Sequence, residues 1–99
     1  MNITDIKIRK HINEGRMRAV MSVTFDDAIV VHDIKVIAGP ERYFLAMPSQ
    51  KLFDGTFRDI MHPINTQERE ALEQAVLQYY FDELKVMEAS EAVFDDTLV

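Results

Sequence analysis

Two basic side chains flank the clearest turn signal in the sequence. Asp54-Gly55 favours a two-residue β-hairpin turn of type I′, which needs positive φ at both central positions. Such a turn predicts that Lys51 lies directly opposite Arg58. Like charges at that spacing repel each other, and a bridging phosphate would offset the repulsion. Asp54 or Asp59 would offset it as well, so an anion-binding hairpin is a hypothesis with an ordinary intramolecular alternative.

Two phenylalanines accompany these cations in the same segment. Phe53 and Phe57 have two possible roles, as platforms on which nucleic-acid bases stack or as members of a local apolar cluster. Leu52 and Ile60 are close in sequence and are also apolar. These neighbours favour the second role, in which both rings are buried.

A second group of cations lies near the N-terminus. Strict alternation along an extended chain predicts that Lys7 and Arg9 lie on the non-core side of one strand. The same alternation predicts that Arg16 and Arg18 lie on the non-core side of the next. Four cations would then share one face of a sheet. The simpler alternative is that polar residues fill a solvent face, as in most antiparallel sheets.

Catalytic and metal-binding patterns are weak in this sequence. His11, His32 and His62 are far apart, and the nearest acidic neighbour of His62 is Asp59, at a spacing that makes no metal site by itself. Cysteine is absent, no serine lies in a nucleophile-elbow motif, and the three glycines form no phosphate-binding loop. We therefore expect no enzyme, no metal and no cofactor, and keep a metal-dependent switch through His62 and Asp59 as an alternative.

Composition fits one small folded domain. The chain has 99 residues, of which 47% are apolar and 28% are charged. Its net charge is −6, yet residues 1–62 hold nine Lys and Arg against eight Asp and Glu, so the acidity lies in residues 63–99. A basic surface is therefore compatible with the N-terminal part. The absence of cysteine, of a secretory signal and of a membrane-spanning run predicts a cytoplasmic location without membrane insertion.

The elements that position these residues follow from hydrophobic periodicity. Alternating or β-branched segments predict strands at residues 3–10, 16–25, 28–38 and 42–47, followed by the short hairpin around residues 51–58. A 3.6-residue period then predicts a helix over about residues 66–88. The predicted fold is α+β: an antiparallel meander of four to five strands plus a short hairpin, then one long amphipathic C-terminal helix packed on the sheet.

The helix has a recognisable start and a buried stripe. Asn65 is the predicted N-cap, with Glu68 three residues later reaching back to the cap. The predicted stripe is Leu72, Val76, Tyr79, Tyr80 and Met87. Residues 1–88 form the predicted single domain. Residues 89–99 are acidic with scattered apolar positions, and we expect a frayed or disordered tail.

Several separated motifs resemble one known family. The segments "GRMRA", "VVHDIKVI", "AMPS" and "DGTFRDIMHPIN" are similar, in order and spacing, to the SpoVG family of bacterial proteins, named for stage V of sporulation and labelled as septation regulators. The resemblance covers roughly residues 1–84. It implies a small non-enzymatic regulator that binds DNA and RNA and takes part in control of septation, sporulation and gene expression. It also implies a homodimer whose subunits pair through a sheet edge.

The resemblance further implies where nucleic acid is contacted. Basic residues directly after "MPS", usually a Lys-Arg pair, are associated with this role, and here these positions are Gln50 and Lys51. A glutamine can still form hydrogen bonds, but it releases no counterion on binding phosphate. Strand alternation and the predicted hairpin add further basic residues to these two positions. The predicted contact residues are Gln50, Lys51, Arg58, Arg16, Arg18, Lys7 and Arg9.

Two functions of different classes follow. The first is a dimeric DNA- and RNA-binding regulator. The second is a protein-interaction adaptor for septum or division machinery, which uses the sheet edge or the acidic helix and touches no nucleic acid. Binding that weakens with salt would favour the first, because phosphate contacts release counterions.

Overall fold

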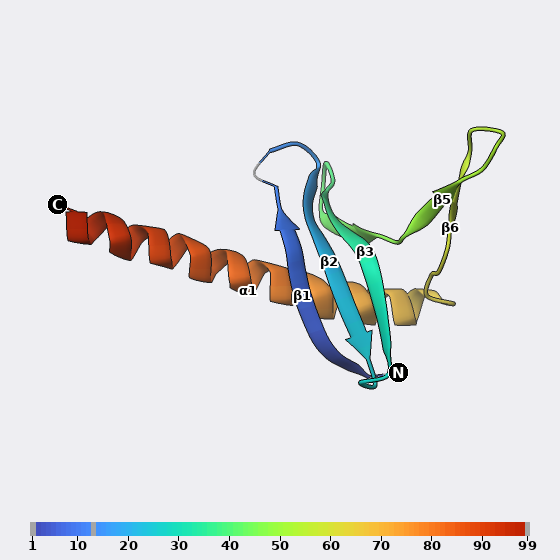
Figure 1. The fold of residues 1–99 in the computed structure, drawn as a ribbon, viewed down its shortest axis with the longest axis horizontal. Coiled ribbons are helices and arrows are strands. Elements are labelled where there is room, and N and C mark those ends of the chain that lie inside the picture. Colours follow the sequence, from blue (N-terminus) through green and yellow to red (C-terminus); the bar gives the residue numbers. More distant parts are fainter. Residues whose placement is uncertain (1, 13, 99) are drawn as a thin grey trace.

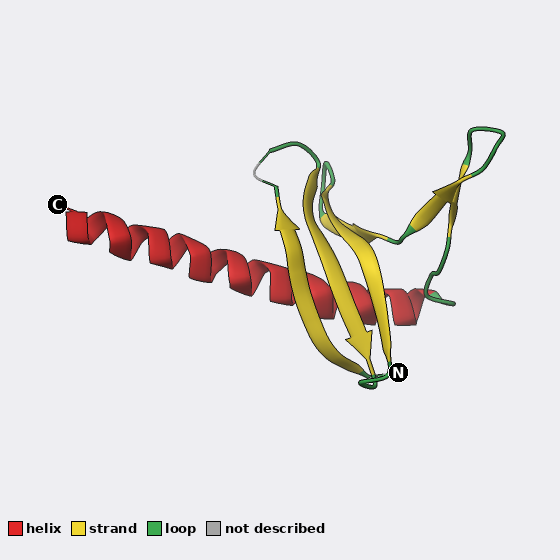
Figure 2. Ribbon diagram, in the orientation of Figure 1, coloured by secondary structure: helices red, strands yellow, loops and turns green. Residues whose placement is uncertain are grey.

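Alternation of apolar and polar residues produces the antiparallel meander that the sequence predicts. The computed structural model describes residues 2–12 and 14–98, and side chains as far as residue 88. Four strands pair in the order β1-β2-β3-β4 (Figures 1 and 2). They are β1 (Ile3–His11), β2 (Met17–Phe25), β3 (Ile29–Ala38) and β4 (Tyr43–Ala46). With the helix that follows, the predicted α+β class is confirmed.

A second, two-stranded sheet stands apart from the first. It consists of β5 (Ser49–Lys51) and β6 (Phe57–Asp59), which pair with each other. The hairpin projects away from the four-stranded sheet (Figure 1), and every residue of both strands is exposed. Its conformation therefore depends on its own turn and ladder rather than on the core.

The helix α1 (Thr66–Leu98) begins at the predicted cap. The Oδ1 atom of Asn65 accepts a 2.8 Å hydrogen bond from the backbone N–H of Glu68, which satisfies a helix N–H that has no partner in the first turn. The helix continues past residue 88, where the hydrophobic pattern placed its end. The side chains of the predicted tail, residues 89–98, and Val99 lie outside the described part, so a frayed tail stays a prediction.

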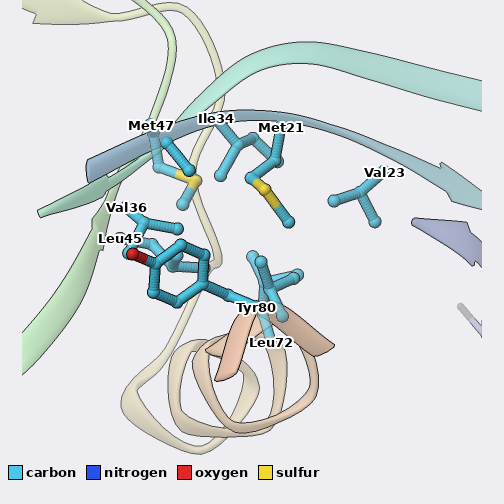
Figure 3. Close-up of a cluster of buried hydrophobic side chains, with 10 residues drawn as sticks. Met21, Val23, Ile34, Val36, Leu45, Met47, Leu72 and Tyr80 are labelled. Carbon is cyan, nitrogen blue, oxygen red and sulfur yellow. The ribbon is translucent and has the colours of Figure 1, made fainter. Parts of the chain in front are cut away.

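The core lies between one face of the four-stranded sheet and α1. Figure 3 shows side chains from the sheet meeting Leu72 and Tyr80 of the helix. Burial of this apolar surface is the main stabilising term of the fold. The buried residues are Ala19, Met21, Val23, Ile34, Val36, Leu45, Met47, Leu72, Val76 and Tyr80.

The predicted stripe of the helix is right at its N-terminal end and wrong at its C-terminal end. Leu72, Val76 and Tyr80 are buried, and Tyr79 packs against the core, but Met87 is 39% exposed. The reason is geometric: α1 runs beyond the sheet (Figure 1), so its later turns have no strand to cover. Along the described residues no helix has the length and apolarity needed to cross a bilayer.

Two helix side chains bind the outer backbone of the edge strand β4. Glu73 is buried, and its Oε2 accepts a 2.9 Å hydrogen bond from the Leu45 N–H. Arg69 donates from Nη2 to the Leu45 carbonyl oxygen at 3.1 Å, and its Nε lies 3.9 Å from Glu73 Oε1. Both backbone groups of Leu45 are thus occupied, as buried polar groups require. We call this arrangement the Leu45 clamp.

Irregularities in the ladder displace several side chains from strict alternation. Arg9 is an extra residue in β1, because Ile8 pairs with Met21 while Lys10 pairs with Val20. Two further shifts place Arg18 as an extra residue in β2, and His32 with Asp33 as two residues opposite one in β3. Such β-bulges redirect side chains. Period-two predictions therefore fail at these positions.

Candidate nucleic-acid interface

The Asp54-Gly55 hairpin forms, but in a different register from the predicted one. Gln50 pairs with Arg58, and Lys51 pairs with Phe57. The predicted pairing of Lys51 with Arg58 is therefore wrong by one residue. Because successive side chains of a strand point to opposite faces, this shift puts the two cations on opposite faces of the hairpin.

The turn itself explains the shift. The Gly55 N–H donates to the Leu52 carbonyl oxygen at 3.0 Å, and the Leu52 N–H donates to the Thr56 carbonyl oxygen at 2.7 Å. Within this fully described turn Gly55 alone has positive φ, at 91°. A type I turn followed by a left-handed residue makes a three-residue loop with a bulge, whereas type I′ needs two positive φ angles.

Asp54 supports this loop through its side chain. Its Oδ1 atom accepts hydrogen bonds from the Thr56 hydroxyl at 2.7 Å and from the Thr56 N–H at 3.0 Å. These bonds, the hydroxyl first and the backbone N–H second, lower the pKa of Asp54 below its ordinary value. Its carboxylate is thus held by the turn, and it is not the partner of Lys51 or Arg58 that the intramolecular alternative required.

The aromatic side chains of the hairpin are exposed. Phe53 is fully exposed and Phe57 is 70% exposed, with Ile60 and Ile64 also exposed nearby. The prediction that both rings belong to a buried cluster is wrong, because the hairpin projects from the sheet and no element in the described part of the chain covers it. One face now presents Lys51 and Phe57 as direct cross-strand neighbours, and the other presents Gln50 and Arg58.

Lys7 and Arg9 do share the open face of the main sheet, opposite α1. With Asp5 they line one wall of a hollow of about 310 Å³, whose other lining residues come from β2 and β3. Lys7 Nζ lies 3.9 Å from the Asp5 carboxylate. Both side chains are largely exposed, and ion pairs of this kind hold their partners weakly. This part of the four-cation prediction agrees with the structure.

Arg16 and Arg18 do not complete that face as predicted. Arg16 lies before β2, where it is exposed, and its carbonyl oxygen accepts a hydrogen bond from the Ala38 N–H. Arg18 is half-buried at a bulge, and its charge acts against the burial that raises the pKa of Tyr80 on the helix. Arg18 thus interacts with the helix side of the molecule. The sequence pattern alone could not show the extra residue that causes this.

The predicted cations differ in how far carboxylates neutralise them. No salt bridge joins Lys51 or Arg58 to a carboxylate of the described residues, whereas Lys7 has Asp5 as a partner. The long-range field of the hairpin is therefore set by its own two cations and by Asp54 and Asp59. These two positive and two negative charges lie within a few residues of one another and largely cancel at a distance. An approaching anion is therefore attracted to Lys51 or Arg58 only at close range.

Among the described residues, histidine and carboxylate side chains form no metal centre. His62 Nδ1 donates to the Pro63 carbonyl oxygen at 2.9 Å, which is the local backbone bond expected at the start of a helix. Over the described ranges, residues 2–12 and 14–98, no group of three potential metal ligands lies together. The alternative of a switch through His62 and Asp59 gains no support from these contacts.

Two polar residues that the sequence prediction did not include lie at the floor of the hollow. Ser22 is buried, and its Oγ lies 2.8 Å from Nδ1 of His32. Arg9 Nη1 lies 3.1 Å from the same nitrogen. No spacing in the sequence indicates this row, since it joins three strands and depends on the bulges in β1 and β3.

These features define a small α+β protein with a projecting basic and aromatic hairpin and a polar hollow on an open sheet face. The SpoVG family profile matches residues 1–83. A protein of Lachnospira eligens, named "Putative septation protein SpoVG", is 60% identical over 80 residues, which cover 81% of this chain and 91% of that protein.

Two further relatives carry the same name. The protein of Clostridioides difficile is 55% identical over 84 residues, covering 85% of this chain and 91% of that protein. The protein of Clostridium perfringens is 53% identical over 91 residues, covering 92% of this chain and all of that protein. The chain belongs to the SpoVG family. Its relatives are named for septation and not for a reaction.

Proposed function

We propose that this protein is a non-enzymatic regulator that binds single-stranded DNA or RNA through the β5–β6 hairpin. The observation that carries the proposal is the pairing of Lys51 with Phe57 on one exposed face. A cation that contacts phosphate beside an aromatic ring that stacks on a base is the usual composition of single-strand-binding surfaces. We assign it a role in control of septation, sporulation and gene expression, as the family resemblance implies, and a cytoplasmic location, as the composition predicts.

The opposite face of the hairpin offers a second set of contacts. Arg58 can bind phosphate or a base edge, and its cross-strand neighbour Gln50 can donate and accept hydrogen bonds. Phe53, at the tip, extends the apolar surface. A strand wrapped around the hairpin would reach both faces, whereas a duplex would reach only one. Preference for single strands follows from this geometry.

A homodimer through a sheet edge is part of the proposal. The edge strand β4 is blocked at the Leu45 clamp, because both outward backbone groups there already have partners. The other edge strand, β1, has nine residues and lies away from the clamp. Pairing through β1 would link two hairpins in one particle. Two linked weak sites bind a continuous strand more tightly than one.

The proposal is tested by binding of a fluorescent single-stranded RNA over a range of salt concentrations. Wild type is expected to give a steep negative log-log slope. Lys51→Ala/Arg58→Ala is expected to bind at least about tenfold more weakly and to have a slope shallower by about one unit or more. Lys85→Ala, on an exposed part of α1, removes a charge elsewhere and serves as the matched control.

Replacement of the rings separates stacking from charge. Phe53→Ser/Phe57→Ser is expected to weaken single-strand binding with little change in salt slope, because stacking releases few counterions. Both rings are exposed, so folding should persist and can be checked by circular dichroism. Wild-type protein that binds no RNA or DNA even at low salt would overturn the proposal.

The second candidate function is a protein-interaction adaptor. The exposed apolar residues of the hairpin and of the segment after it favour this candidate, since contiguous exposed apolar surface marks protein contacts as well. These residues are Phe53, Phe57, Ile60 and Ile64. Capture of a division protein that survives high salt and the Lys51→Ala/Arg58→Ala change, with no RNA binding, would establish the adaptor in place of the regulator.

A further inference from the structure

The open face of the main sheet has a hollow lined mostly by charged and polar side chains. Its lining residues of β2 alternate with the buried residues Met21 and Val23, so it lies on the sheet face opposite α1. Its volume is about 310 Å³, near the lower end of ligand pockets. Three strands contribute to it. Its lining residues are Asp5, Lys7, Arg9, Ser22, Thr24, Val30 and His32.

A hydrogen-bonded row crosses the floor of this hollow. Arg9 of β1 and Ser22 of β2 both approach Nδ1 of His32 of β3, at 3.1 Å and 2.8 Å. A guanidinium can only donate, so this nitrogen is the acceptor in its contact with Arg9. Ser22 is buried with only 7% of its surface exposed, which fixes the row in place.

The backbone is irregular where this row forms. Arg9 occupies a bulge in β1, and His32 occupies a bulge in β3. Asp33, the next residue, has a φ of 64°, in the left-handed region that non-glycine residues seldom adopt. Strained positions of this kind gather at binding sites, where they direct side chains.

We propose that this hollow binds a phosphate group and that binding is coupled to protonation of His32. Lys7 and Arg9 supply the positive charge, and the Thr24 hydroxyl supplies a further donor. The Ser22 hydroxyl donates to His32 Nδ1, so it becomes a donor to the phosphate only when that nitrogen carries a proton. Donors on three strands suit a tetrahedral oxyanion, whose oxygens point in several directions, better than a planar carboxylate. Asp5 is the one carboxylate in the wall, and it opposes binding.

The coupling follows from the single nitrogen that the row shares. A proton added at Nδ1 of His32 would displace Arg9 and donate to Ser22 instead. The freed guanidinium, now repelled by the imidazolium, turns toward the bound oxyanion, and the imidazolium adds a positive charge. Proton and anion therefore favour each other's binding, and the linkage is reciprocal. The charged groups that line the hollow with His32 are Asp5, Lys7 and Arg9 of β1. Asp33, its neighbour in the chain, is also charged.

The source of the phosphate links this inference to the proposed function. A phosphodiester of the nucleic acid bound at the hairpin and the phosphate of a free nucleotide have the same chemistry. The inference deepens the proposed function only in the first case. Nuclear magnetic resonance titrations with inorganic sulfate, with a 5′-mononucleotide and with a short single-stranded RNA distinguish these two sources. Each titration shows whether that ligand shifts the amide signals of β1, β2 and β3.

Sulfate is the probe for the proton coupling, because its charge does not change between pH 5.5 and pH 8. Wild type is expected to bind sulfate several-fold more tightly at the lower pH. His32→Gln, which keeps an acceptor but cannot gain a proton, should bind with the same affinity at both values. His62→Ala is the histidine control, and it should keep the pH dependence.

Variants that remove a positive or a negative charge from the hollow provide an independent check, because they should change sulfate affinity in opposite directions. Arg9→Ala should weaken sulfate binding at least about tenfold, whereas Asp5→Asn should strengthen it. Lys10→Ala, an exposed lysine of β1 outside the hollow, is the matched control and should have little effect. Sulfate that perturbs no amide near Arg9, Ser22 and His32, or a pH dependence that survives His32→Gln, would overturn the inference.

The outcomes also separate this inference from the proposed function. RNA binding that is lost in Lys51→Ala/Arg58→Ala but unchanged in Arg9→Ala and His32→Gln, with no sulfate binding, would leave the hairpin function and remove the phosphate site. Sulfate and nucleotide binding in the hollow, with no RNA binding at all, would leave the phosphate site and remove the hairpin function.

Discussion

Two hairpins of the molecule, β2–β3 (here the first hairpin) and β5–β6 (the second hairpin), have aspartate-containing turns but different supports. The β2–β3 turn has Asp26 and Asp27, with φ of 54° and 52°, and the Ala28 N–H donates to the Phe25 carbonyl oxygen at 2.9 Å. This is type I′ geometry with two aspartates at its centre. The β5–β6 turn has Asp54 and Gly55, which suit type I′ better, yet of these two residues only Gly55 has positive φ.

Contacts with β1 account for the difference. The Asn2 N–H donates to Asp26 Oδ1 at 2.9 Å, the Asp26 N–H donates to the Asn2 carbonyl oxygen at 2.8 Å, and the Asp27 N–H donates to Thr4 Oγ1 at 2.9 Å. The β5–β6 turn has only its own Asp54 and Thr56. Tertiary partners can thus stabilise an unfavourable turn, whereas an isolated turn follows local energetics. We expect substitutions in the first hairpin to act on the whole fold, and those in the second to act locally.

The largest effect should come from truncation of a buried side chain in the first hairpin. Met21 of β2 is completely buried, so Met21→Ala is expected to lower the free energy of unfolding by about 2–5 kcal/mol. Phe57→Ala in the second hairpin removes more atoms but should change it by less than about 0.5 kcal/mol, because the ring is exposed. Urea denaturation followed by circular dichroism measures both. Equal effects would end the distinction between the two hairpins.

A smaller effect should come from the turns themselves. Asp26→Ala removes the bond from Asn2 and leaves alanine in the left-handed region, at an expected global cost of about 1–2 kcal/mol. Gly55→Ala imposes a similar backbone strain at φ 91°, with open space around the new Cβ. Its cost should be confined to the hairpin, seen as faster amide exchange in β5 and β6 at an unchanged melting temperature. A lowered melting temperature for Gly55→Ala would contradict local behaviour.

The smallest effect should be the acid response of the second turn. The pKa of Asp54 is lowered in the fold, so its contribution is present above the ordinary value of 3.8 and is lost as pH falls through the folded value. Below that pH the Thr56 amide is expected to exchange faster, while amides of Met21 and Val23 remain protected. Asp54→Asn, which keeps an acceptor oxygen but does not titrate, should remove this pH dependence. Persistence of the response in Asp54→Asn would assign it to another group.

Most of the fold could be predicted because its signals are local. Alternation gave the four strands within a few residues, and Asn65 marked the helix start that its side chain caps. The extent of the buried helix stripe could not be predicted, because the width of the sheet determines how many helix turns are buried against it. Met87 matches the apolar period and is nevertheless exposed.

The candidate site was less accessible from sequence, because it depends on register. A shift of one residue separated Lys51 from Arg58 and placed Lys51 beside Phe57. The bulge at Arg18 turned a predicted surface cation toward the helix side. Neither irregularity has a local sequence signal. The choice of Lys7 and Arg9 as neighbours agreed with the structure, while their contact with the Ser22–His32 row required three strands to be aligned.

The Leu45 clamp sets a limit on growth by strand addition. Fibrils and other open-ended stacks need every subunit to offer two free sheet edges, one for the copy before it and one for the copy after. Here Glu73 and Arg69 occupy one of these edges from within the same chain. A pair of copies joined through their β1 strands would therefore present a clamped β4 strand at each outer edge of the combined main sheet.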